Sequence, residues 1–353
     1  MDVSFWVWIA TLAGLTGVIL LDLLLVDAHP HAFGPKEATR WVIFYVALAI
    51  AFGIGIHFVW GATYSTQFFA GYITEYSLSV DNLFVFIIIM SAFAVPREHQ
   101  HRVLLVGVVI ALILRGILIA IGAAALSAFS VTFYFFGALL IYTAFRLAKG
   151  DEGGADPADN PMVKLAGRFL PTTEHYDGSK LVTRVDGRRV VTPMLMVMIA
   201  IGTTDVIFAL DSIPAIFGLT QEAYLVFTAN AFALMGLRQL FFLVKGLLEK
   251  LVYLSYGLAV ILGFIGVKLI LHALHTTTSL QVPEISTGLS LIVILVVLLI
   301  TTVVSLIAVR RNPGLISGAQ AVVHEREVQS RMGPEPDEER PGRAGDEHPD
   351  QED

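Results

Sequence analysis

Long apolar segments set the fold class of this chain. They are about as long as the 20 residues that an α-helix needs to cross the hydrocarbon core of a bilayer. Of all residues 56% are hydrophobic and only 15% are charged, outside the range of soluble domains. Nine spans follow, near 5–26, 41–60, 67–95, 103–126, 130–148, 193–217, 222–245, 251–272 and 287–309. The sequence therefore predicts an all-α polytopic membrane protein in contact with lipid.

The distribution of Lys and Arg predicts its orientation. These residues fall in every second connection, at 27–40, 96–102, 149–192 and 245–251, and in the tail after 309. The alternate connections, at 61–66, 127–129, 218–221 and 273–286, contain none. Because basic residues stay in the cytoplasm, we expect an external N-terminus, a cytoplasmic tail and insertion in the cell membrane. Seven or eight spans would break this alternation.

Three regions follow from this pattern. A transmembrane domain covers 1–311, and its connection 149–192 forms a cytoplasmic loop. Asp186-Gly187 lies between two β-prone runs of that loop and predicts a small β-hairpin. The segment 312–353 holds eleven acids and four arginines, equal to the whole net charge of −7, so it is expected to be a disordered acidic tail. The rest of the chain is neutral, and nothing predicts a nucleic-acid partner.

Four acids lie inside the apolar spans, in two pairs with the same spacing of six: Glu75 with Asp81, and Asp205 with Asp211. An ionised carboxylate at the centre of a bilayer costs about 2.5–3.5 kcal/mol, so such residues usually bind an ion, a proton or a partner charge. The pairs lie on spans three and six, which run in opposite directions. We therefore expect two inverted three-helix repeats, helices 3–5 (about 67–148) and 6–8 (about 193–272).

Two arginines occupy matching places in these repeats. Arg115 lies within span four and Arg238 within span seven. We interpret both as charge partners of the acids and not as ligands. Four acids and two arginines leave a charge of −2, which one divalent cation would balance if all six side chains converge.

The same segments carry a family resemblance. The chain resembles the TerC family of integral membrane proteins, named for tellurium resistance, over about 41–272. The resemblance is carried by three segments: ITEYSLSVDNLFVF, TPMLMVMIAIGTTDVIFALDSIPAIFGLT and FTANAFALMGLRQLFFLV. The resemblance implies export of divalent cations, manganese above all. It implies that Asp81, Asn82, Asp205, Asp211 and Ser212 match the acidic motifs of the family. Gly202 stands where many members carry an acid, which would alter affinity or metal choice.

The chemistry of these side chains suits the implied cargo. Carboxylate, amide and hydroxyl oxygens bind hard cations such as Mg²⁺, Ca²⁺ and Mn²⁺. We predict Asp81 and Asp211 as core ligands, with Glu75 at the periphery and the other motif residues completing the shell. In a straight helix Asp81 points about 120° away from Glu75, so we expect the helices to be unwound. Pro214 would cause such a helix break in the second repeat.

Other functions stay open at this stage. A proton-coupled carrier of a small oxyanion or organic solute would use the acids as proton relays and the arginines as anion ligands. A non-transporting scaffold of a tellurium-resistance complex would need the 149–192 loop but not the acids. We expect no enzyme and no cofactor, because the chain has no cysteine, no HExxH and no GxSxG motif.

Overall fold

The structure, a computed structural model, describes most of the membrane domain. It covers residues 1–27, 35–149, 168, 171–173, 176–178, 180–185, 188–244, 251–278 and 282–312. Within these ranges it leaves undescribed the side chains of residues 22–27, 35–36, 81, 84, 91, 97–98, 101, 185, 188, 238 and 242–244. The tail beyond 312 and the Asp186–Gly187 turn therefore lie outside the described residues.

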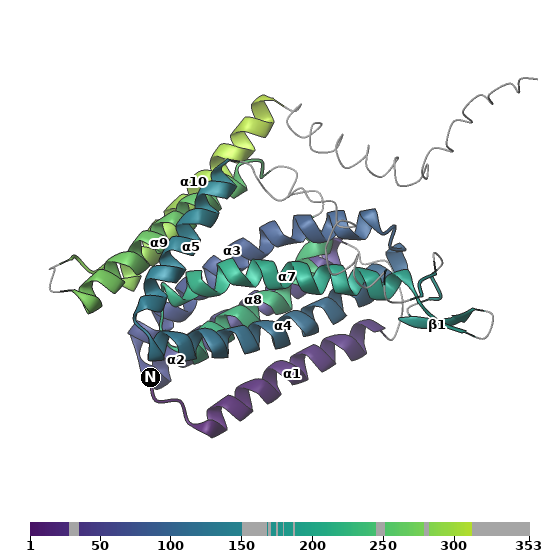
Figure 1. Cartoon of the computed structure of the whole chain (residues 1–353), viewed down its shortest axis with the longest axis horizontal. Coiled ribbons are helices and arrows are strands. Elements are labelled where there is room, and N and C mark those ends of the chain that lie inside the picture. The colour runs from purple at the N-terminus through teal and green to yellow at the C-terminus, as the bar shows by residue number, and fades with distance from the viewer. Residues whose placement is uncertain are drawn as a thin grey trace, which may run out of the picture.

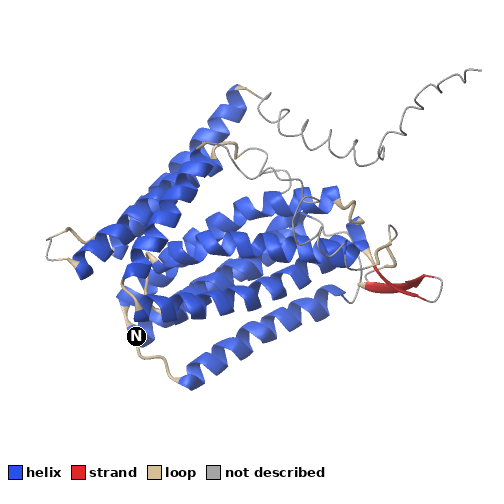
Figure 2. Ribbon diagram, viewed as in Figure 1, coloured by secondary structure: helices blue, strands red, loops and turns tan. Residues whose placement is uncertain are grey.

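The described chain is almost entirely helical (Figure 2). Its elements are α1 (Phe5–Asp27), α2 (Pro35–Trp60), α3 (Ala62–Ala92), α4 (Arg97–Ala128), α5 (Val131–Ala148), β1 (Val182–Val185), β2 (Arg188–Val191), α7 (Pro193–Phe217), α8 (Ala223–Val244), α9 (Leu254–Thr277) and α10 (Thr287–Arg311). Seven of these helices are long and apolar enough to cross a membrane: α2 to α5, α7, α9 and α10. Within the described residues α1 and α8 offer only the shorter apolar stretches Phe5–Leu21 and Ala223–Leu237. Seven of the nine expected spans thus have the required length.

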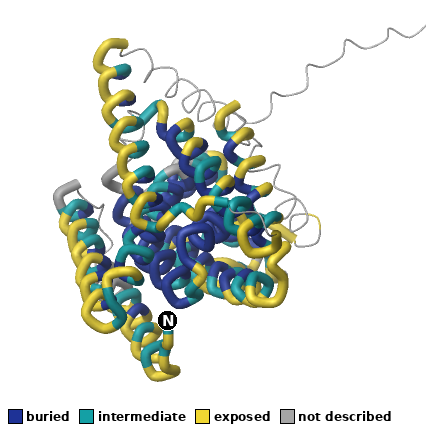
Figure 3. Tube along the Cα trace, turned by 90° about the vertical axis from the view of Figure 1, so that its left-hand side faces the viewer, coloured by how far each residue is buried: buried dark blue, intermediate teal, exposed yellow. Residues whose placement is uncertain are grey.

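The helices form two groups (Figure 1). In the first, α3 packs against α8, α4 packs against α7, and α2 covers α8 and α3. In the second, α5, α9 and α10 run together at an angle to the first group, with α5 and α9 in extensive contact. Buried residues concentrate in the middle of the first group, while the outer helices carry most of the exposed surface (Figure 3). Large apolar side chains such as Phe58, Ile121 and Leu299 are exposed there, as a lipid-facing surface requires.

Two glycines bring α5 and α9 together. A Cβ built at Gly137 would lie 2.9 Å from the carbonyl oxygen of Gly266, and a Cβ built at Gly266 would lie 2.9 Å from the carbonyl oxygen of Gly137. The missing side chains therefore let the two backbones touch, as small residues do at helix crossings in membranes. One turn nearer the start of α9, a Cβ at Gly263 would meet only the Cβ of Ala144, at 3.6 Å.

The connections without Lys or Arg gather at one end of the molecule. Gln221 and the ring of His272 are hydrogen-bonded at 2.9 Å, Thr287 donates to the carbonyl of Leu219 at 3.2 Å, and the hydroxyls of Tyr134 and Thr277 are 2.7 Å apart. These bonds join the 218–221 connection to the end of α9 and the start of α10, and the start of α5 to the end of α9. These contacts place the ends of α5, α7, α9 and α10 on one side of the molecule.

The connection before α7 holds the only strands of the described residues. β1 and β2 pair antiparallel in the register Val182 with Val191, so they form a hairpin around residues 186–187 (Figure 2). The hydroxyl of Tyr176 donates to the carbonyl of Phe93 at 2.7 Å and ties this connection to the end of α3. Burial raises the pKa of Tyr176 to about 12, so its hydroxyl stays neutral and able to donate at physiological pH.

Candidate functional site

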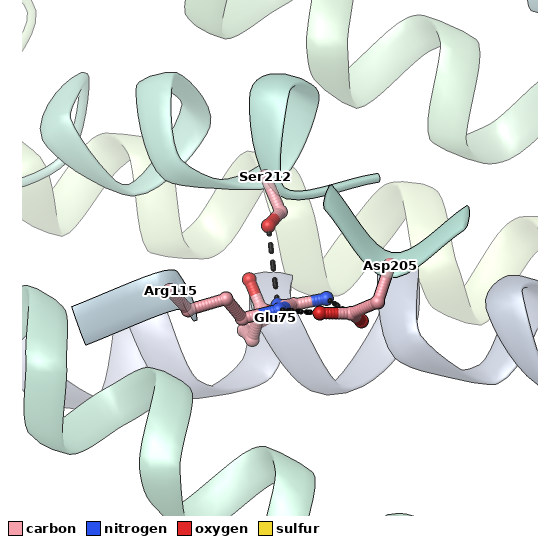
Figure 4. Close-up of polar contacts among 4 residues, drawn as sticks. All are labelled: Glu75, Arg115, Asp205 and Ser212. Carbon is pink, nitrogen blue, oxygen red and sulfur yellow. Dashed lines mark hydrogen bonds and ion pairs between the residues drawn. The ribbon is translucent and has the colours of Figure 1, made fainter. Parts of the chain in front are cut away.

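A buried ion-paired cluster lies in the first helix group. Glu75 comes from α3, Arg115 from α4, and Asp205 and Ser212 from α7; each residue is at most 1% exposed. The positions 205 and 212 are seven residues apart, which places them on the same face of α7. Four side chains from three helices therefore meet in the centre of the bundle (Figure 4).

The guanidinium of Arg115 holds this cluster together. Its Nε donates to Asp205 Oδ2 at 3.1 Å and its Nη2 donates to Asp205 Oδ1 at 2.9 Å, a bidentate pair. Its Nη1 donates to Glu75 Oε1 and, at 3.3 Å, to the hydroxyl of Ser212. Burial of a lone charge would be strongly unfavourable, so each of these charges depends on the others.

Three buried side chains of α3 and α8 have polar atoms without a hydrogen-bond partner among the described residues. Within the described part of the chain, Glu75 Oε2, Ser79 Oγ and both amide atoms of Asn230 have no partner. Ser79 lies one turn beyond Glu75 on the same face of α3. On α8, Asn230 lies one turn from Phe227 and next to Ala229. Phe227 contacts α4 beside Gly116, and Ala229 contacts α3 at Gly71. Asn230 thus lies on α8 close to the level of Glu75 and Arg115.

The second acid of α7 faces elsewhere. Asp211 Oδ1 accepts a hydrogen bond of 2.8 Å from the hydroxyl of Thr143 on α5, so this carboxylate lies at the boundary between the two helix groups. Six residues along a continuous helix correspond to about 9 Å of rise and about 120° of rotation. The structure therefore brings Asp205 to Glu75 and does not bring Asp211 to the same cluster.

The expected unwinding is not present. α7 is helical from Pro193 to Phe217 and includes Pro214, and α3 is helical from Ala62 to Ala92. Pro214 lies in the last turn of α7, where its missing N–H removes one helical hydrogen bond, to the carbonyl of Leu210, and the helix continues to Phe217. In the continuous α3, Glu75 lies beside Asp205 of α7 and not beside position 81 of its own helix. This pairing of acids from two helices does not require α3 to unwind.

The remaining predicted residues are placed only in part. Asn82 is 7% exposed on α3, within the buried part of that helix. The side chains of Asp81 and Arg238 lie outside the described residues, although the backbone places Asp81 on α3 and Arg238 on α8. Ser79 and Asn230 were absent from the predicted ligand set. The spacing of Ser79 from Glu75 could have indicated it, whereas no local pattern marks Asn230.

The described residues contain no preformed metal centre built from several acidic or histidine side chains. Among the described residues there is no group of three or more His, Asp or Glu side chains that could hold a metal ion. A cation at Glu75 and Asp205 would have to compete with Arg115 for the same oxygen atoms. The arrangement can therefore bind a cation only together with a movement of the guanidinium.

Helices of membrane length around a buried carboxylate–arginine cluster define the chain as a multi-pass integral membrane protein. The model of the integral membrane protein TerC family matches residues 60–312, and the chain belongs to this family. The match includes the cluster residues of α3, α4 and α7.

Several relatives support this membership. An uncharacterized membrane protein of Mycobacterium bovis is 47% identical over 86% of this chain and 80% of its own length. The chloroplastic thylakoid membrane protein TERC of Arabidopsis thaliana is 42% identical over 72% of this chain and 67% of its own length. Alx of Escherichia coli (strain K12) is 38% identical over 72% of this chain and 82% of its own length. No solved structure matches this one.

Proposed function

We propose that this protein exports divalent cations, Mn²⁺ above all, across the cell membrane in exchange for protons. The observation that carries the proposal is the meeting of Glu75 and Asp205, one acid from each half of the chain, in a buried cluster. Intramembrane carboxylates of this kind mark ion pathways. Their oxygens and the hydroxyl of Ser212 are ligands that hard cations prefer.

An inverted repeat is part of the proposal. Exchanging α3, α4 and α5 with α7, α8 and α9 turns the α3–α8 contact into the α7–α4 contact, and both are present. The same exchange maps the α5–α9 pair onto itself, which agrees with the reciprocal approach of Gly137 and Gly266. Such repeats form substrate sites where the two halves meet and expose them to each side in turn.

The direction of transport requires an energy source. With a cytoplasm negative by about 100 mV, outward movement of a divalent cation costs roughly 4.6 kcal/mol from the potential alone. Protons are the natural counter-ion, because the same carboxylates can bind them. The charge alternation supports an external N-terminus and a cytoplasmic tail for this exporter. In this proposal the protein needs no cofactor and catalyses no reaction. Its export activity contributes to metal homeostasis or tellurite resistance.

The pairing of Arg115 favours a cation over an anion as the cargo. A carrier of oxyanions would need arginine donors directed at its substrate, whereas Arg115 donates its hydrogen bonds to Glu75, Asp205 and Ser212. The scaffold alternative rests on no contact of this cluster, because it would need the 149–192 loop and not the acids.

Transport by purified protein in sealed vesicles tests the proposal. A fluorescent Mn²⁺ indicator inside the vesicles should report Mn²⁺ movement, with Mg²⁺, Ca²⁺ and tellurite as competing substrates. Asp205→Asn should lose transport, because it removes a charged ligand from the cluster. Asp177→Asn, which removes a carboxylate outside the membrane helices, should transport like wild type. Equal Mn²⁺ transport by Asp205→Asn and wild type would refute the proposal.

A further inference from the structure

Arg115 occupies the position that a bound cation would take. Its guanidinium donates to both Asp205 oxygens, to Glu75 Oε1 and to Ser212, which together are most of the oxygen ligands in the cluster. It is itself 1% exposed, so it is shielded from solvent in this arrangement. A positive group built into the chain therefore competes directly with any cation for this site.

The charges make the two occupants mutually exclusive. Glu75, Asp205 and Arg115 carry a net charge of −1. A divalent cation added beside Arg115 would leave +1 in a buried membrane site, whereas the same cation in place of Arg115 would leave zero. Because uncompensated charge is expensive in a low-dielectric interior, joint occupancy is disfavoured, and displacement requires a new position for the guanidinium.

The unmet hydrogen bonds indicate which oxygens would complete the shell. Glu75 Oε2, Ser79 Oγ and the Asn230 amide are buried and have no partner among the described residues. Each carries an oxygen of the kind that binds hard cations. Unsatisfied groups of this kind are costly inside a membrane, so a second arrangement that satisfies them gains stability.

We infer that Arg115 is an internal counter-cation that the transported ion displaces. In one arrangement Arg115 neutralises Glu75 and Asp205; in the other a divalent cation binds these carboxylates together with Ser79 and Asn230, and the guanidinium withdraws. The inference rests on the proposed function for the identity of the cation. It assigns a purpose to a charge that would otherwise block the site: Arg115 offsets part of the negative charge of the carboxylates when no divalent cation is bound.

Measurement of Mn²⁺ binding to purified protein tests this role. Electron paramagnetic resonance of free Mn²⁺ gives the dissociation constant without any need for transport. Arg115→Gln removes the competing charge, so it should lower the dissociation constant by about a hundredfold. Arg115→Lys keeps the charge but cannot form the bidentate pair, so its affinity should lie between those of Arg115→Gln and wild type.

A matched control separates competition from a general effect of charge. Lys268 is a partly buried cation on α9 that donates to Ser290 at 3.1 Å, away from the cluster. Lys268→Gln should leave the dissociation constant within roughly twofold of wild type. Equal tightening by Lys268→Gln and Arg115→Gln would overturn the inference.

Other outcomes are equally decisive. Unchanged or weaker Mn²⁺ binding by folded Arg115→Gln overturns the inference, as does an absence of binding by both variants and wild type. If Arg115→Gln does not fold, Arg115→Lys decides: tighter binding supports the inference and unchanged or weaker binding overturns it. If wild-type protein transports Mn²⁺ but the variants do not bind it more tightly, the proposed function is supported and the counter-cation role is refuted. Tighter binding without wild-type transport would leave the counter-cation role and refute export.

Discussion

The crossing of α5 and α9 gives a quantitative prediction. In Gly137→Ala the new Cβ would lie 2.6 Å from Ile270 Cγ1, 2.9 Å from the Gly266 oxygen and 3.3 Å from the Ile270 nitrogen, where ordinary contact begins at 3.4 Å. The helices must therefore separate by roughly 0.5–1 Å, and overpacking of this kind costs about 1–3 kcal/mol. Gly266→Ala should cost a similar amount, because its Cβ would meet the Gly137 oxygen and Ile141.

Thermal unfolding in detergent, followed by circular dichroism, measures this loss. Gly263→Ala is the matched control on α9, because its Cβ would find ordinary contact at 3.6 Å and should change stability by less than about 0.5 kcal/mol. The double variant of Gly137 and Gly266 should be less destabilised than the sum of the single variants, since one separation relieves both contacts.

The absence of cysteine provides a second assay of the same spacing. Ala144→Cys with Gly263→Cys would place two Cβ atoms near 3.6 Å, within the range of a disulfide. Oxidation should link α5 to α9 rapidly, and Gly137→Ala should slow it. Stability of Gly137→Ala equal to that of Gly263→Ala, with unchanged cross-linking, would refute the close crossing.

Four further outcomes are expected. Asp211→Asn and Asp81→Asn should each lower Mn²⁺ export by roughly tenfold or more while the protein remains inserted, as vesicle transport would show. Proton entry should accompany Mn²⁺ exit and disappear in Asp211→Asn; efflux against its gradient with the proton gradient collapsed would exclude this coupling. Tyr176→Phe should weaken the connection before α7 by about 1 kcal/mol, seen as faster proteolysis. Hydrogen bonds from Thr183 and Lys180 lower the pKa of Asp177, so its contribution to this connection is present above about pH 4 and is lost as the pH falls through its depressed pKa, which proteolysis against pH would reveal.

Much of the fold could be predicted from the sequence because apolar length and charge alternation are local signals. The helices, their order and the β-hairpin at 182–191 follow from composition and turn residues. Arg115 could be recognised as a charge partner, since a buried arginine requires a carboxylate. These statements need no knowledge of how one helix rotates against another.

The choice of acids in the cluster could not be predicted in the same way. Helical spacing shows that Asp205 and Asp211 face different directions, but it does not show which direction leads to α3. That depends on contacts such as Gly71 with Ala229 and Gly107 with Ile201, which fix the rotation of each helix. The expected unwinding assumed that acids of one helix share an ion, whereas acids of two helices meet at Arg115. Asn230 carries no pattern of its own and is identified only by its burial.

The two acids of α7 have a consequence for energetics. Asp205 faces α3 and α4, and Asp211 faces Thr143 on α5, yet both belong to one continuous helix. A rotation or shift of α7 that opens one carboxylate must change the surroundings of the other. Binding free energies at the two carboxylates are therefore linked. By reciprocity, the factor by which a proton at Asp211 changes the affinity of Asp205 for an ion equals the factor by which that ion changes the affinity of Asp211 for a proton.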